Sequence, residues 1–133
     1  MADAVTSQTL IDGERMVIMK FTNISDGTGE SAVLKVDVSA LTASATGAVC
    51  DRVTVTKIYI STHGMEVRML WDADTDVPFF LSAPNTTQTL DMSSFGGITN
   101  NGGAGVTGDI MFSTADASSG DTYWCILEMV KGY

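Results

Sequence analysis

The sequence is poor in positive charge. Its 133 residues include 7 Lys and Arg against 16 Asp and Glu, which gives a formal net charge of -9. A polyanion of this kind is repelled by phosphate backbones and cannot release their counterions. Nucleic acid is therefore not expected as a partner.

Long apolar runs are also missing. The longest, Tyr123 to Leu127, has five residues, whereas a helix needs roughly 20 to cross a bilayer. The stretch MADAVTSQTL has no basic residue, and the first apolar run, Met16 to Met19, is short. We expect neither a membrane partner nor an export signal.

Cysteine and histidine are scarce. Cys50 and Cys125 are the only cysteines, and their separation excludes the C-x-x-C hook of a zinc site. We expect two free thiols, with a Cys50 to Cys125 bridge as the alternative. Cys125, within YWCIL, is expected to behave as a small buried hydrophobe. The single histidine, His63, excludes chemistry that needs two imidazoles.

Candidate catalytic residues are correspondingly few. Ser61, His63 and Asp72 could form a triad on paper, but no G-x-S-x-G nucleophile elbow surrounds any serine. Nothing singles out a pair of carboxylates for glycoside hydrolysis. Asn85 begins the glycosylation acceptor NTT, which means little without a secretory signal. The sequence predicts no enzyme activity and no catalytic, cofactor-binding or metal site.

What the sequence does contain is apolar residues at a period of two, typical of β-strands. In RVTVTKIYIS (52–61) this alternation puts Val53, Val55 and Tyr59 on one face. In MEVRMLWD (65–72) it buries Met65, Val67, Met69 and Trp71. The STHG link predicts a β-hairpin between the two strands, in which Gly64 supplies a positive φ.

Six further segments read as strands bounded by turn residues, and hardly any segment has a helical period. The segment 39–50 is expected to carry one helical turn or to remain a loop. The sequence therefore predicts an all-β, antiparallel, single-domain sandwich or barrel of the jelly-roll or Greek-key type over residues 13–133. Residues 1–12 form an N-terminal segment, expected as an extended docking arm that adds a strand to a neighbour's sheet edge. The six strand segments span residues 14–24, 32–38, 77–82, 87–92, 108–114 and 121–131.

Two of these strands, RMVIMKF and YWCILEMV, are apolar on both faces. Either they are central strands covered on both sides, or another protein chain covers their outer face. The sequence leaves both interpretations open.

Two loop motifs resemble ligand-binding sites. Gly103, Gly105 and Gly108 have the spacing G-x-G-x-x-G, but the motif leaves a loop and enters a β-like segment, so a dinucleotide site is not expected. Asp72, Asp74 and Asp76 have the spacing that opens a calcium loop, yet Val77 replaces its glycine, which excludes an EF-hand. A looser calcium site and aspartates that cap their own turn remain the two interpretations of these residues.

Across nearly all 133 residues the chain resembles small virion structural proteins of tailed bacteriophages, through stretches such as LWDADTDVPF and FGGITNNGGAG. The resemblance implies a non-enzymatic cement or decoration protein that binds the outside of the capsid. It also implies the major capsid protein and further copies of this chain as partners, trimers as the assembly, and the virion, assembled in the host cytoplasm, as the location.

Three other functions remain open from the sequence. A tail, neck or head-fibre component would share the fold and differ in its place in the particle. A carbohydrate-binding module would use Trp71 or Trp124 as a stacking platform. An undetected hydrolase is the third.

Overall fold

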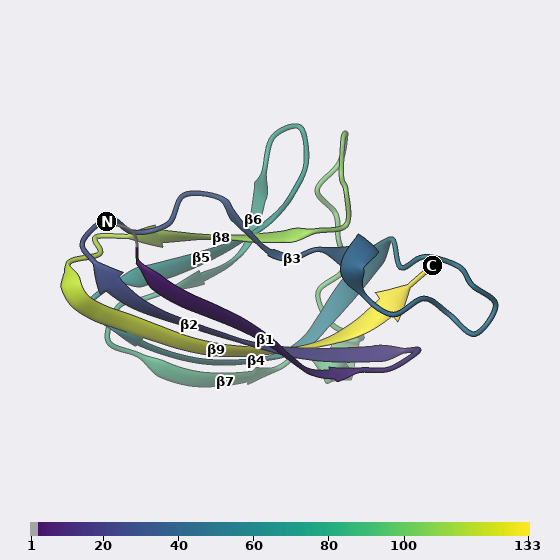
Figure 1. Cartoon of the computed structure of the whole chain (residues 1–133), viewed down its shortest axis with the longest axis horizontal. Helices are drawn as coiled ribbons and strands as arrows, with labels where there is room; N and C mark the ends of the chain where they lie inside the picture. The colour runs from purple at the N-terminus through teal and green to yellow at the C-terminus, as the bar shows by residue number, and fades with distance from the viewer. Residues whose placement is uncertain (1–2) are drawn as a thin grey trace.

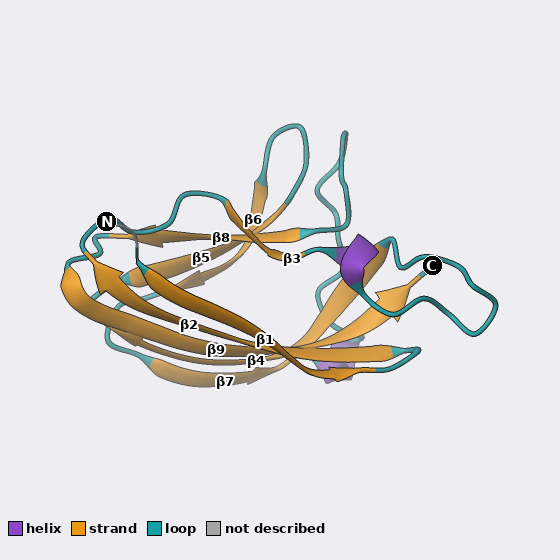
Figure 2. Cartoon of the chain, viewed as in Figure 1, coloured by secondary structure: helices purple, strands orange, loops and turns teal. Residues whose placement is uncertain are grey.

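The computed structural model describes residues 3–133, and these form two antiparallel β-sheets packed face to face (Figures 1 and 2). A five-stranded sheet has the order β1-β2-β9-β4-β7, and a four-stranded sheet has the order β3-β8-β5-β6. The strands are β1 (Ala4–Asp12), β2 (Met16–Asp26), β3 (Val33–Val36), β4 (Arg52–His63), β5 (Glu66–Trp71), β6 (Val77–Ser82), β7 (Thr87–Asp91), β8 (Ile110–Ala115) and β9 (Ser119–Gly132).

The strand order is that of a jelly roll. Strands β2 to β9 supply four strands to each sheet. Between β2 and β9 the chain passes from one sheet to the other at every step except β5 to β6. A double sheet of eight strands built from two Greek keys defines this architecture. The predicted all-β, antiparallel jelly-roll class is therefore confirmed, with β1 added at one edge.

The core lies between the two sheets. Met65, Val67, Met69 and Trp71 are all buried, as their alternation predicted. Aromatic rings join the layers: Phe21 of β2 meets Phe112 of β8 edge-on at a ring-centroid distance of 5.1 Å. Such contacts add to the burial of apolar area, which is the main favourable term in folding.

The predicted faces of β4 are wrong beyond Val55. The pairing of β4 with β9 shifts register between Val55 and Lys57. One extra residue reverses which side chains point inward, so Ile58 and Ile60 join Val53 and Val55 in the core. Tyr59 points outward instead, and its hydroxyl donates to Glu128 Oε2 at 2.8 Å.

The predicted hairpin between 52–61 and 65–72 is also wrong. Strand β4 pairs with β7 and β9, whereas β5 pairs with β6 and β8 in the other sheet. Gly64 does have the predicted positive φ, of 83°, but its turn carries the chain across the sandwich. The alternation of apolar residues shows which side chains face inward. It is the same whether two consecutive strands pair in one sheet or face each other across the sandwich, so it could not distinguish the two arrangements.

Two short 3-10 turns complete the described chain, Val38–Ala40 and Ser93–Phe95. The first overlaps the start of segment 39–50, and the rest of that segment is irregular. The second was not predicted.

Strands β2 and β9 are neighbours inside the five-stranded sheet. Their inner faces are buried, but Ile24 and Trp124 on the outer face are exposed. The chain does not cover both of their faces, so the first interpretation of the doubly apolar strands is wrong.

Residues 4–12, assigned from the sequence to the N-terminal segment, form β1 and pair with β2 of the same chain. Carboxylates hold both ends of this strand. Asp3 accepts from the Asn23 side chain and from the backbone N–H of Asp26 and Gly29. Asp12 pairs with the Nζ of Lys131 and accepts from Thr42 N at 2.9 Å. The expected docking role of residues 1–12, of which residues 1 and 2 lie outside the described part of the chain, stays a prediction.

The pKa values of Asp3 and Asp12 are both below their ordinary range. Partial burial acts to raise them, but hydrogen bonds from Asn23 to Asp3 and from Lys131 to Asp12, with those from backbone N–H groups, outweigh it. Because the folded pKa lies below the unfolded one, each carboxylate stabilises the fold above the unfolded pKa of about 4. That stability is lost as the pH falls through the folded pKa.

We therefore predict that replacing both carboxylates, as Asp3→Asn with Asp12→Asn, lowers the free energy of unfolding at pH 6 more than at pH 3. Urea denaturation at the two pH values measures the difference. Asp74→Asn, on an exposed loop, is the control and should change stability little at either pH. An equal loss at pH 3 and pH 6 would contradict the assignment of the two carboxylates.

Candidate functional site

A polar cluster lies inside the sandwich at the end near the start of β1. Asn23 of β2, Glu30 of the loop before β3, Lys35 of β3 and Tyr123 of β9 are all buried. Glu30 is its centre: Lys35 Nζ lies 2.6 Å from Glu30 Oε2, and Tyr123 OH donates to Oε1 at 2.7 Å. Asn23 Nδ2 donates to the same Oε1 at 2.7 Å and to Asp3 Oδ2 at 3.1 Å.

The sequence analysis did not identify this cluster. Its local cause is a register shift between Leu34 and Val36 on β3, which turns two consecutive side chains, Lys35 and Val36, into the interior. Bulges often redirect side chains in this way. The one signal in the sequence was a Lys within the apolar strand VLKV. That signal does not reveal which acidic residue pairs with the Lys.

The cluster is a structural network, closed except at Asn23 Oδ1, which is buried without a hydrogen-bond partner among the described residues. The pKa of Tyr123 lies far above its ordinary value. Burial is the largest cause, followed by the hydrogen bond that Tyr123 makes to Glu30 and by the negative charge of Glu30. The phenol therefore stays protonated and donates. Each charge is met by its partner, as buried charges require. The cluster fastens the loop before β3, and through Asn23 the start of β1, to the five-stranded sheet.

The glycine motif lies in a loop that leads into a strand, as the sequence predicted. Gly103, Gly105 and Gly108 all have positive φ, and the chain runs from them into β8, not into a helix. Gly105 packs so closely on Asp74 that any Cβ would overlap the Asp74 carboxylate. Close approach and left-handed backbone therefore explain these glycines, and the predicted passage from loop to strand is confirmed.

The three aspartates of the loop between β5 and β6 do not converge on a common point. Asp76 Oδ1 accepts from the backbone N–H of Ala73 at 3.2 Å, and Asp72 Oδ2 accepts from Thr107 Oγ1 at 2.8 Å. Asp74 is exposed. Within residues 3–133, no group of three or more His, Cys, Asp or Glu side chains is arranged to hold a metal ion. The hydrogen bond that Asp76 accepts from Ala73 matches the turn-capping interpretation.

The remaining chemical candidates are separated by the fold. Ser61 and His63 lie on β4, whereas Asp72 follows β5 of the opposite sheet, so the structure does not assemble that triad. Cys50 and Cys125 are free and buried, and the alternative disulfide is wrong. Burial raises the pKa of both thiols, which lowers their reactivity. Asn85 is exposed, and its Oδ1 accepts from Gly64 N.

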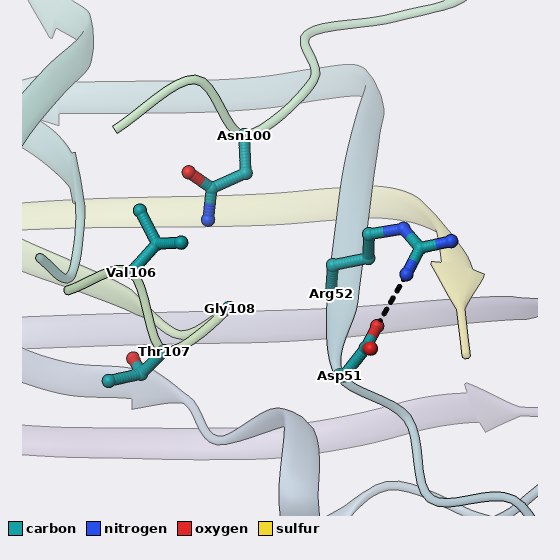
Figure 3. A pocket seen from close by; sticks show the side chains of 6 residues that line it. All are labelled: Asp51, Arg52, Asn100, Val106, Thr107 and Gly108. Carbon is teal, nitrogen blue, oxygen red and sulfur yellow. Dashed lines mark hydrogen bonds and ion pairs between the residues drawn. The ribbon is translucent and has the colours of Figure 1, made fainter. Parts of the chain in front are cut away.

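A shallow pocket of about 330 Å³ opens at one end of the molecule (Figure 3). The ion pair of Arg52 Nη1 and Asp51 Oδ1, 2.7 Å apart, stands on one side of it, and Asn100 and Val106 stand on the other (Figure 3). Both charged side chains are more than half exposed, so the pair is weak. The adjacent carboxylate already offsets the charge that Arg52 could offer an anion.

A more distinctive surface is the outer face of the four-stranded sheet. The strand register places Leu34 beside Met111, Met111 beside Leu70, and Leu70 beside Pro78. These four residues, the apolar row, cross the whole sheet, with Leu34 and Pro78 exposed and Leu70 and Met111 half-buried. Leu81 of β6 stands next to the row and is 65% exposed.

Two loops form a wall at one end of this face. The loop between β5 and β6 and the loop before β8 both rise away from the five-stranded sheet (Figure 1). They are tied together where Thr107 N donates to Asp72 O and Asp74 N donates to Ala104 O, both at 3.1 Å. The wall carries Asp72, Asp74 and Asp76, so an acidic rim borders an apolar floor.

The two tryptophans differ in exposure. Trp71 is fully buried and stacks on Phe79 at a centroid distance of 4.2 Å, so its expected role as a sugar platform is wrong. Trp124 is 41% exposed on the outer face of the five-stranded sheet. Its neighbours across β2 and β4 are Thr22 and Ser61.

Comparisons with known proteins add little. No family model and no curated protein matches the sequence. Among solved structures, a cupin superfamily protein from Desulfitobacterium hafniense is similar over 98% of this chain and 80% of its own, at 12% sequence identity and a TM-score of 0.35. So distant a likeness supports no argument about function, and the fold assignment rests on the strand order. Among the described residues, no helix is long and apolar enough to span a membrane.

The buried cluster generates a stability prediction. Glu30→Gln leaves the Lys35 ammonium without its carboxylate, and Lys35→Met leaves Glu30 without its cation. Either change should lower the free energy of unfolding by about 3–5 kcal/mol, because it leaves an uncompensated buried charge. The double variant should cost clearly less than the sum of the two. Urea denaturation measures the cycle, with Lys57→Met on the outer face of β4 as control. Additive effects would show that the two groups do not interact.

Proposed function

We propose that this protein is a non-enzymatic structural component of a bacteriophage particle, a cement or decoration protein that binds the outside of the capsid across joints between coat subunits. The sequence resemblance suggests the particle, and a jelly roll is compatible with the role, although fold alone does not imply function. The observation that carries the proposal is the apolar row, Leu34, Met111, Leu70 and Pro78.

The apolar row has the properties of a protein-binding surface. It is continuous across four strands and is extended by Leu81, and the nearby Arg68 and Glu66 of β5 pair with each other at 3.5 Å. Exposed apolar patches rimmed by polar groups mark interaction sites. The acidic wall of Asp72, Asp74 and Asp76 favours a partner whose contact surface is apolar with a basic border.

The net charge of -9 is consistent with the outer side of a capsid. An acidic protein is repelled by packaged DNA but not by a shell surface that offers basic groups. Many identical copies, each bound to neighbouring subunits, would hold the shell together by multivalency even where one contact is weak.

A tail, neck or head-fibre position would use the same fold and the same surface. The copy number distinguishes these locations. Quantitative mass spectrometry of purified virions of the phage that encodes the chain should find hundreds of copies for a cement protein. A few copies per virion would place the protein in the tail or neck, and its absence from virions would overturn the proposal.

We predict that Leu34→Asp together with Leu81→Asp lowers occupancy on the particle by roughly tenfold or more, which corresponds to about 1.4 kcal/mol. Both side chains are exposed, so the fold should tolerate the change. The matched control is Val49→Asp together with Phe95→Asp, which adds the same charge at exposed positions outside the row. Sedimentation of decorated particles measures bound protein. Equal occupancy of the two variants would show that the apolar row is not part of the docking surface.

A carbohydrate-binding role retains one supporting observation, the exposed Trp124 between Thr22 and Ser61. Stacking of a sugar ring on this indole would change its fluorescence, whereas the buried Trp71 would report little. Glycan-array binding that is lost in Trp124→Ala would favour this function over the structural one.

A further inference from the structure

Strand β1 is an open sheet edge. It pairs with β2 on one side only, and it is the terminal strand in the order of the five-stranded sheet. Every residue of β1 except Asp12 is exposed. The backbone of alternate residues must therefore direct N–H and C=O groups away from β2, as in any antiparallel edge strand.

The other three sheet edges of the described chain are shorter or more interrupted than β1. Strand β3 has four residues and an irregular register. Strand β6 contains Pro78 and a register shift beside it. Strand β7 has five residues and ends in the charged Asp91. Short length, proline, bulges and charges are the usual devices that prevent pairing with another chain. Strand β1 has nine residues, and its one register shift, between Thr9 and Ile11, leaves the run from Ala4 to Thr9 regular.

Charge distinguishes β1 further. Residues 4–11 contain no charged side chain, although the whole chain has a net charge of -9. The two acids that flank the strand are already engaged, Asp3 with Asn23 and backbone N–H groups, and Asp12 with Lys131. Two copies can therefore approach along this edge without bringing unpaired carboxylates together, whereas the acidic loops of two copies repel each other.

We propose that β1 pairs antiparallel with β1 of a second copy of this chain, joining two five-stranded sheets into one continuous sheet across a twofold axis. An antiparallel pair of identical strands is self-complementary, as a twofold contact requires. Backbone hydrogen bonds supply the attraction, and Val5 and Leu10, about half exposed in one chain, become partly covered. The proposal does not depend on the virion role, because it concerns the purified protein alone.

The test uses charge at the centre of β1. Thr6 and Gln8 lie on the same outer face, beside Thr22 and Lys20 of β2. With the twofold axis near Ser7, Thr6 of one copy stands opposite Gln8 of the other, so Thr6→Glu with Gln8→Glu places like charges together, and Thr6→Lys with Gln8→Lys does the same. Sedimentation equilibrium of the natural chain should give twice the 14.0 kDa of one chain. Each charged variant should be monomeric, and an equal mixture of the two should form dimers again.

The matched control is Thr87→Glu with Thr89→Glu, which adds the same charge to β7 at the opposite edge of the same sheet. This variant should stay dimeric. Hydrogen exchange gives a second measurement, since the amides of residues 4–9 that point away from β2 should gain protection as the concentration of the natural chain rises. A monomer at every concentration, a trimer, or dimers that persist in either β1 variant alone would overturn the proposal.

Discussion

The structure depends on one constraint: each sheet can hide its apolar side chains only against the other sheet. Within residues 3–133 no α-helix covers either sheet, so the inner faces of β2, β9 and β4 must meet those of β8 and β5. The contact of Phe21 with Phe112 shows this packing directly. Because the burial of apolar area dominates folding free energy, the inward residues are fixed and the outward ones are free for other roles.

The buried polar cluster around Glu30 contributes less to the stability of the fold than that apolar packing. Glu30 and Lys35 enter the sandwich at the end where the loop before β3 must be fastened, and their charges cancel each other. A buried pair of this kind contributes little net stability, but loss of one partner is costly. The pair therefore holds the loop in one place, and Asn23 extends the same network to Asp3 at the start of β1. Electrostatics position the edge strand, and hydrophobic packing holds the sandwich together.

Alternation along the chain was enough to predict strands, the all-β class and most of the core, because burial of one face has a period of two. It failed where the period is interrupted. The bulge after Val55 moved Ile58 and Ile60 into the core and Tyr59 out of it. The shift at Lys35 brought a charge inside. Neither register shift was predicted, because each is seen only in the pairing with a partner strand.

The sequence also did not allow the pairing partner of each strand to be predicted, because pairing depends on residues distant in the chain. The turn at Gly64 has the conformation of a hairpin turn but joins two sheets, and only the packing of the whole chain decides between these outcomes. The candidate site was less predictable still. The apolar row consists of one residue from each of four strands, none conspicuous alone, and becomes visible only when the register aligns them.

The distribution of charge links these surfaces to assembly. A chain with 16 acidic residues repels its own copies, so contacts between copies can form only where the acids are absent or neutralised. Carboxylates gather on loops such as 72–76, while residues 4–11 and the apolar row carry none. The free side of β1 lies in the plane of one sheet, and the apolar row lies on the outer face of the other. The two proposed contacts therefore use different residues, backbone groups of β1 in one case and outward side chains of the four-stranded sheet in the other.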